Sequence, residues 1–503
     1  MKKIAMQSLT FFSLNYRVLA PSSKKQQQRS IRRQTGAISI MFALLFIPIV
    51  GICALALDLA MVYNRQAEMH SFAKAVAISA ARRLNGTPSG IDNAVSDAAL
   101  SAGAALYKNH NESIAWTAAA LKFGTSANPN GQWVDAGTAS SMAAKIFFAR
   151  VDTSAISGAG AVQTAIAAIL SADFATVTTG SDVIAGKTDI AVAPLGVCAM
   201  GAPASARTNP GGYVELVEYG FRRGVNYDLM NLNPNASSAV SFVINPLAAP
   251  GTSGAASGFA TATVGPYACT GTLAIPGVTG GKLSVAQPFP LGALYSQLNS
   301  RFDQYTGASC TVNAAPPDAN IKAFNYTDMV SPLAWMNTQP VGQTASAAPS
   351  ASRLETIADI APAGGTAVQY GPLWSYARAV AYSTYTASPV EPLNGYATLP
   401  TSAWTNLYGG QTAKSSYPAS TPYKAGTGIN FSKPNAAHGN GTRNRRVLNV
   451  ALLDCSTTPS STADVLAIGK FFMTVPATST VLAAEFAGII PLDRIPGNTG
   501  LFQ

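Results

Sequence analysis

A long apolar run near the N-terminus constrains the fold of this chain more than any other feature. Residues 37–57 carry no charged side chain, and a helix of that length spans about 30 Å, the thickness of the hydrocarbon core of a bilayer. Pro48 and Gly51 lie inside the run, and membrane helices tolerate both residue types. The run therefore predicts one transmembrane helix.

The charges on either side of the run predict its orientation. The basic residues before the run are Lys2, Lys3, Arg17, Lys24, Lys25, Arg29, Arg32 and Arg33. The first acid of the chain is Asp58, directly after the run. Because basic residues mark the cytoplasmic side of a membrane helix, Arg32 and Arg33 place the N-terminus in the cytoplasm. Residues from Asp58 onward are then expected outside.

This basic tail also accounts for most of the net charge. The chain has 33 Lys and Arg against 23 Asp and Glu, for a net charge of +10. Without the eight basic residues of the tail, 25 basic residues face 23 acidic ones, a net charge of +2. Such a nearly neutral remainder argues against a nucleic-acid partner. The low charged fraction of 11%, against about 25% in soluble proteins, suits a cell-envelope protein.

A cleavable signal peptide is the alternative to a retained anchor. Ala54, Leu55 and Ala56 form an A-x-A pattern, which is typical of cleavage sites and would release a secreted adhesin or surface protein after Ala56. The run is longer than the 7 to 15 residues typical of signal peptides. A helical pattern of apolar residues also continues through Met69 and Val76 until the sequence Asn-Gly-Thr-Pro at 85–88, which stops a helix. Both observations favour the anchor.

The segment "GAISIMFALLFIPIVGICALALDLAMVYNRQAEMHSFAKAVAISAARRL" resembles the N-terminal region of the TadE/TadG-like proteins of the Flp, or tight-adherence, pilus system. In that family a Gly, an apolar helix with an internal Pro, an Asp and an Arg follow one another, and Gly36, Pro48, Asp58 and Arg65 match them here. The resemblance implies a non-catalytic component of pilus assembly or a related secretion apparatus. Its expected partners are pilus or envelope machinery proteins and the lipid bilayer, with a possible partner helix in the membrane.

The same resemblance raises the question of processing. Pseudopilins of the family are cut after a Gly, and Gly36 is the matching position. Type IV prepilins carry a Glu five residues after the cut, where this chain has Met41. This difference favours an uncut, TadG-like protein whose N-terminal segment stays in the bacterial inner membrane and whose C-terminal part lies in the periplasm.

The rest of the chain predicts an α+β fold. Short runs rich in Val, Ile, Thr and aromatic residues lie between Gly, Pro and Asn clusters and indicate strands. Helices are expected after Pro290 and from Leu373. The predicted parts are a basic tail (1–36), the transmembrane helix (37–63), an Ala-rich helical region (64–106), a β-rich extracytoplasmic lobe (107–342) and a second lobe (352–503) with a flexible stretch (409–446).

Four of the five cysteines fall on the predicted outside of the membrane. An even number in an oxidising compartment suggests two disulfides, for which three pairings exist. We favour Cys269 with Cys310 and Cys198 with Cys455, and expect Cys53 to be a small apolar residue of the membrane run.

Metal binding and catalysis have little support in the sequence. Asp454, Ser456 and Thr458 fit a D-x-S-x-T pattern, as in the Mg²⁺ site of von Willebrand factor A domains, which makes a metal-dependent adhesion module the second alternative. Only 45 residues follow Thr458, too few for the further βα units that supply the other ligands. Common catalytic motifs are absent. The sequence therefore predicts no enzyme and no cofactor.

Overall fold

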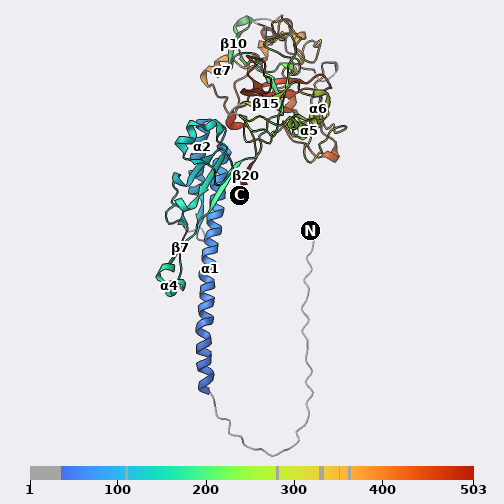
Figure 1. The fold of residues 1–503 in the computed structure, drawn as a ribbon. Helices are drawn as coiled ribbons and strands as arrows, with labels where there is room; N and C mark the ends of the chain where they lie inside the picture. The colour runs from blue at the N-terminus through green and yellow to red at the C-terminus, as the bar shows by residue number, and fades with distance from the viewer. Residues whose placement is uncertain are drawn as a thin grey trace, which may run out of the picture.

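The computed structural model describes residues 35–107, 112–278, 282–327, 333–350, 352–360 and 364–502. It is an α+β structure in which one long apolar helix leads into a large β-rich region with a few helices (Figure 1). The predicted fold class is therefore confirmed. Arg32 and Arg33, on which the predicted orientation depends, lie outside the described residues.

Helix α1 (Thr35–Arg83) is a single helix of 49 residues that contains Pro48. At about 1.5 Å per residue it is about 73 Å long. The part of the chain that the structure describes holds one helix long and apolar enough to cross a membrane, and it is this one. Figure 1 shows its N-terminal half projecting away from the folded domains and its C-terminal half packed among them.

Helix α2 (Pro88–Ala104) turns back beside α1 and packs against it. The turn lies at the predicted stop, since α1 ends at Arg83 and Thr87 caps α2 by accepting a hydrogen bond from the backbone N–H of Gly90. Proline at the first position of α2 suits a helix start, because the missing N–H would have no partner there.

Helix α1 packs on a five-stranded antiparallel sheet and has α2 on its other side, and together these elements form what we call the proximal domain. Its strand order is β20-β8-β5-β3-β4. The strands are β3 (Leu121–Gly124), β4 (Trp133–Val134), β5 (Phe148–Asp152), β8 (Asp182–Lys187) and β20 (Thr499–Phe502). Two hairpins, β1 (Leu106–Tyr107) with β2 (Glu112–Ser113) and β6 (Ala161–Gln163) with β7 (Thr176–Thr178), and helices α3 (Ala136–Ser141) and α4 (Ala167–Leu170) complete it.

The remaining residues between β8 and β20 form the distal domain around an eight-stranded sheet. The strand order is β13-β19-β18-β16-β9-β14-β15-β17, and every pair is antiparallel except β9 with β16. The strands are β9 (Leu195–Cys198), β13 (Asn226–Asp228), β14 (Phe242–Ile244), β15 (Leu283–Ala286), β16 (Val447–Leu453), β17 (Thr462–Ala463), β18 (Val465–Met473) and β19 (Ala483–Ile489).

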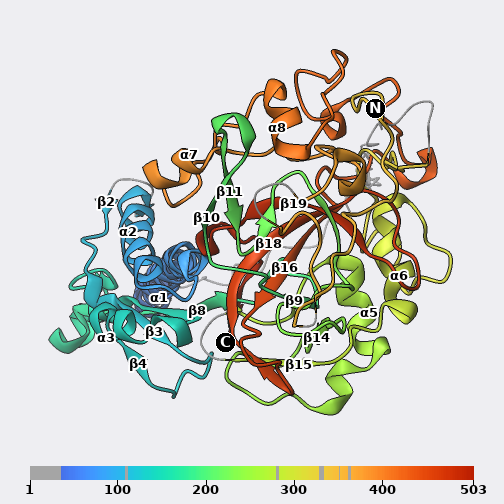
Figure 2. The same cartoon turned by 90° about the horizontal axis from the view of Figure 1, so that it is seen from above.

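Both faces of this sheet are covered. On β16, Val450 and Leu452 belong to one buried cluster, while Ala451 and Leu453 belong to another, as expected when alternate side chains point to opposite faces. The other regular elements of the distal domain are helices α5 (Thr261–Thr270), α6 (Leu291–Leu298), α7 (Tyr382–Ala387) and α8 (Trp404–Tyr408), and the small sheet of β10 (Ser205–Thr208), β11 (Val214–Glu218) and β12 (Phe221–Arg222). Figure 2 shows the distal sheet beside the end-on view of α1.

The eight-stranded sheet takes strands from both sides of the boundary predicted between 342 and 352. Strands β9, β13, β14 and β15 precede it and β16 to β19 follow it. The last strand of the chain, β20, returns to the proximal sheet and pairs with β8. The structure thus groups the residues by proximal and distal sheet, because strand pairing joins segments that are far apart in the chain.

The helix predicted from Leu373 is wrong. Residues 373–381 contain no helix, and α7 begins only at Tyr382. Trp374 has a φ of +57°, which no right-handed helix allows. The backbone N–H groups of Ser375, Tyr376 and Ala377 instead donate to the buried carboxylate of Glu485 at 2.6 to 2.9 Å. A tertiary contact has therefore replaced the helical hydrogen bonds. The helix predicted after Pro290 is confirmed as α6.

The stretch 409–446 has two 3₁₀ turns, at Pro422–Lys424 and Ala436–His438, and otherwise no helix or strand. The side chain of Asn320 bridges it, because its amide donates to the carbonyls of Tyr423 and Asn430 at 3.0 and 2.9 Å and its oxygen accepts from Ser432 at 3.1 Å. The stretch is thus irregular but hydrogen-bonded to the distal domain.

Candidate functional site

The surroundings of α1 change abruptly at Asp58. Residues 40–57 are exposed except for the half-buried Ala54. From Asp58 onward, one face of the helix is buried in the proximal domain, beginning with Asp58, Arg65 and Met69. Asp58 and Arg65 are seven residues apart and so lie on the same face, two turns from each other. The helix is therefore exposed and apolar up to residue 57, and from Asp58 onward one of its faces is packed in the proximal domain.

Asp58 holds the loop between β6 and β7 against the helix. Its carboxylate accepts hydrogen bonds from the backbone N–H groups of Ala165, Ile166 and Ala167 at 3.1, 2.8 and 2.8 Å. These groups lie at the start of α4, where backbone N–H groups lack partners within the helix. The side chain is only 4% exposed. Asp58 was predicted to mark membrane topology, and its binding of this loop could not be read from the sequence.

Two further polar contacts continue this attachment along α1. The guanidinium of Arg65 donates to the carbonyl of Ala159 and pairs with Glu68 at 3.0 Å. The ring Nδ1 of His70 lies 2.9 Å from the hydroxyl of Ser181. We call the residues 159–181 that receive these contacts the collar. Asp58, Arg65 and His70 thus join the helix to the collar at three levels.

Above the collar, α1 contributes to the core of the proximal domain. Its buried side chains there are Met69, Phe72, Ala73, Val76, Ala77, Ala80 and Ala81. They face β5 and β8 on one side and α2 on the other. The alanines allow close approach of the neighbouring backbones, so the helix cannot be withdrawn without opening this core.

This arrangement defines a class of protein: a domain built around the C-terminal half of a long helix whose apolar N-terminal half is exposed and long enough to cross a membrane. Comparison with known families agrees, since residues 36–83 match the family Tad, described as "Putative Flp pilus-assembly TadE/G-like". The match coincides with α1 and includes both Asp58 and Arg65. No curated protein and no solved structure matches the chain.

The two candidate processing positions both lie within α1. Gly36 is in its first turn, and Ala56 lies in the middle of the continuous helix, two residues before Asp58.

The candidate metal ligands lie in a turn at the end of β16. Asp454 follows the last residue of that strand, and its carboxylate accepts the backbone N–H of Ser456 at 2.8 Å. This bond holds the pKa of Asp454 below its usual value. Ser456 and Thr458 are exposed. Among the described residues, no cluster of three or more His, Cys, Asp or Glu side chains could hold a metal ion.

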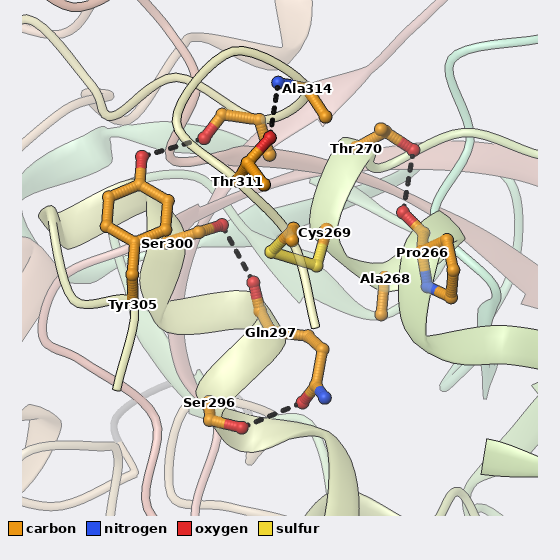
Figure 3. Close-up of a disulfide and its surroundings, with 12 residues drawn as sticks. Pro266, Ala268, Cys269, Thr270, Ser296, Gln297, Ser300, Tyr305, Thr311 and Ala314 are labelled. Carbon is orange, nitrogen blue, oxygen red and sulfur yellow. Dashed lines mark hydrogen bonds between the residues drawn. A yellow bond between two sulfur atoms is a disulfide. The ribbon is translucent and has the colours of Figure 1, made fainter. Parts of the chain in front are cut away.

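Four cysteines form two disulfides in the distal domain. Cys198 and Cys455 are joined with Cα atoms 5.6 Å apart, and Cys269 and Cys310 with Cα atoms 6.1 Å apart. These are the two pairings that the sequence favoured. Figure 3 shows the second bridge, which ties α5 to the loop beyond α6. Cys53 is a free, exposed cysteine of the apolar part of α1.

The distal domain also has a cleft lined by charged side chains. Arg223, Arg378, Lys470, Arg494 and the carboxylate of Glu391 contribute to it. Most of these charges have partners: Glu391 pairs with Arg223 at 2.9 Å and with Lys470 at 3.7 Å. Burial lowers the pKa of Lys470. With Lys424 also in its lining, the cleft has five basic side chains and one carboxylate, so it keeps an excess of positive charge.

Proposed function

We propose that this chain is a non-catalytic, single-pass inner-membrane component of Flp/Tad-type pilus assembly or of a related secretion apparatus. Its N-terminus is cytoplasmic, and the proximal and distal domains are periplasmic. One observation carries the proposal: the family match over 36–83 coincides with the helix that stands free below Asp58 and is built into a domain above it. The basic tail supports the orientation.

Mechanistically, α1 positions the two domains at a fixed height above the membrane. A helix that continues without a break from the bilayer into a domain core transmits position and rotation, whereas a flexible linker would not. In the free half, an added Cβ at Gly51 would meet no atom within 4 Å, and Ala54, three residues further on, lies on the same side of the helix. Small residues of this kind permit close packing of a partner helix in the membrane.

The distal domain would contact pilus subunits or other components of the machinery. It contains most of the chain and lies farthest from the free end of α1 in Figure 1. A rigid stalk that holds a large, disulfide-linked domain away from the membrane suits an assembly or anchoring role.

Neither alternative function gains a specific observation. A metal-dependent adhesion module of the von Willebrand type needs further βα units beyond Asp454, but the next strands are β17, which pairs antiparallel with β15, and β18, which returns antiparallel to β16. A secreted adhesin would require cleavage after Ala56, inside a continuous helix.

N-terminal sequencing of the protein from the membrane fraction tests the anchor. We expect the sequence to start at Met1. A start at Ala37 would indicate prepilin-type processing, and a start at Leu57, with the protein recovered in the medium, would overturn the anchor in favour of a released protein.

Complementation tests the role in pilus assembly. A strain that lacks this chain should lose surface pili, and the full chain should restore them. The matched control is residues 57–503 exported behind an unrelated cleavable signal peptide, which keeps both domains and removes the anchor. Unchanged pili in the deletion strain would refute the proposed role, and full rescue by the anchorless control would refute the need for the helix.

A further inference from the structure

The loop between β6 and β7 presents apolar side chains to the surroundings. Residues 164–175, which we call the collar loop, have the sequence TAIAAILSADFA and contain one charged residue, Asp173. Ile169 is 77% exposed and Phe174 is 54% exposed. Large apolar side chains with so much exposure indicate contact with something outside the chain when they lie close together.

The position of this loop relative to α1 indicates what its exposed side chains contact. Asp58, the first charged residue after the apolar run, binds the loop through the N–H groups of residues 165–167. The loop is therefore held at the level where the transmembrane segment must leave the hydrocarbon core. Figure 1 shows α4, at the tip of this loop, beside α1 and extended from the rest of the proximal domain toward the free half of the helix.

The chemistry of the loop fits the boundary between lipid headgroups and acyl chains. Its backbone N–H groups at 165–167 are satisfied by Asp58, so the loop can approach an apolar phase without leaving these donors unpaired. Ser171 accepts the backbone N–H of Asp173, and the exposed Asp173 carboxylate belongs at the level of the headgroups. Tyr63, 63% exposed on α1, lies just above Asp58, where aromatic residues with a polar end gather at membrane interfaces.

We infer that the collar loop is a second membrane contact, which inserts Ile169 and Phe174 into the outer surface of the bilayer beside α1. This inference rests on the proposed membrane insertion of α1. Two points of contact fix the tilt and rotation of the proximal domain relative to the membrane, which a single helix leaves free. Asp58 acts as the positioning residue that sets the height of the loop.

Spin labels on the full chain in vesicles of phosphatidylethanolamine and phosphatidylglycerol test this inference. In a Cys53→Ser background with both disulfides intact, single labels are placed by Ile169→Cys and Phe174→Cys. Ile49→Cys serves as the reference inside the bilayer, and Leu247→Cys, at an exposed position of the distal domain, as the reference in water. The measurement is the accessibility of each label to oxygen, which concentrates in lipid, and to a water-soluble nickel complex.

We expect the labels at 169 and 174 to resemble the label at 49, with accessibility shifted from nickel toward oxygen. Labels at 169 and 174 that match the label at 247 while the label at 49 remains in lipid would overturn the inference and leave the anchor standing. A label at 49 that is open to nickel would overturn both. Labels at 169 and 174 that are shielded from both reagents would indicate a protein partner at the loop and would also overturn the inference.

Asp58→Ala tests the positioning role separately. Loss of the carboxylate should shift the label at 169 toward nickel accessibility, and Asp58→Asn, which keeps one oxygen acceptor, should restore part of the wild-type value. Unchanged accessibility in Asp58→Ala would show that Asp58 does not position the loop. Circular dichroism of each variant checks that the helices and sheets remain folded.

Discussion

The proximal and distal domains differ in the side chains that they bury and in their covalent links. In the proximal domain, half of the buried residues of α1 and α2 are alanine, including Ala77, Ala80, Ala94 and Ala98. The distal domain buries large side chains completely, among them three tryptophans and three arginines: Trp335, Trp374, Trp404, Arg222, Arg301 and Arg446. Both disulfides also lie in the distal domain.

This difference follows from the kind of chain segment that each domain packs. The proximal domain packs around one long helix, and small side chains let helix and sheet approach closely at little cost in side-chain entropy. The distal domain has long irregular segments whose backbone groups need partners. Buried arginines supply such partners: Arg446 donates to the carbonyls of Asn320, Lys322, Met473 and Thr474. Close packing thus supports one domain, and polar and covalent links support the other.

The disulfides should give the largest effect, confined to the distal domain. The bridge Cys198–Cys455 spans 257 residues and the bridge Cys269–Cys310 spans 41. Loop-closure entropy gives upper limits of about 5.5 and about 4 kcal/mol for their contributions. We therefore expect the double variant Cys198→Ser, Cys455→Ser to lose more stability than Cys269→Ser, Cys310→Ser, in denaturant titrations followed by tryptophan fluorescence. The reverse order would show that strain or local packing outweighs the length of the closed loop.

The buried ion pair of Arg222 and Glu215 should give the next largest effect. The two side chains are fully buried and 2.7 Å apart. Arg222→Met leaves a buried carboxylate without its cation and should cost about 3 to 5 kcal/mol.

The matched control is the double variant Glu215→Leu, Arg222→Met, which removes both charges and should recover much of that loss. Denaturant titration of the single and double variants measures the difference. A double variant that is no more stable than Arg222→Met would contradict this explanation.

Glu485 should make the stability of the distal domain depend on pH. Burial raises the pKa of this carboxyl from its ordinary value of 4.5 to about 7, although three backbone N–H groups favour the ionised form. The folded state therefore holds the proton more tightly than the unfolded state, and stability falls as the pH rises from about 4.5 to about 7. The full change corresponds to about 3 kcal/mol.

Glu485→Gln provides the control for this pH dependence, since it removes the titrating group and keeps an oxygen acceptor. The difference in unfolding free energy between wild type and this variant should decrease with rising pH across that window. A difference that stays constant between pH 4.5 and 7 would show that Glu485 is ionised throughout.

The sequence predicted the long apolar helix well because its signals are local. Length, charge and the absence of acids before Asp58 all lie within one continuous segment, as does the Asn-Gly-Thr-Pro stop at 85–88. The match to the Tad family covers this same segment. Short-range patterns are enough to predict an element that is long and regular and whose signals lie in its own sequence.

The sequence failed where distant residues decide the local structure. The segment after Leu373 has a helical pattern, but Glu485, more than 100 residues away, takes its N–H groups. The contact between α1 and the collar could not be predicted for the same reason, since nothing near Asp58 in the sequence indicates that its carboxylate binds residues 165–167. The strand pairing of β8 with β20 likewise depends on contacts across the whole distal domain.

The smallest predicted effect tests the close packing of the proximal domain. Ala77 is fully buried on α1, whereas Ala75, two residues away on the same helix, is exposed. Ala77→Leu inserts a larger side chain into a packed core and should cost about 1 to 3 kcal/mol, while Ala75→Leu should stay within about 0.5 kcal/mol of wild type. Hydrogen exchange of the α2 amides measures both variants, and only Ala77→Leu should speed it. Equal exchange in the two variants would mean that α2 and the sheet shift to accept the larger side chain. The proximal domain would then be less tightly packed than the distal domain.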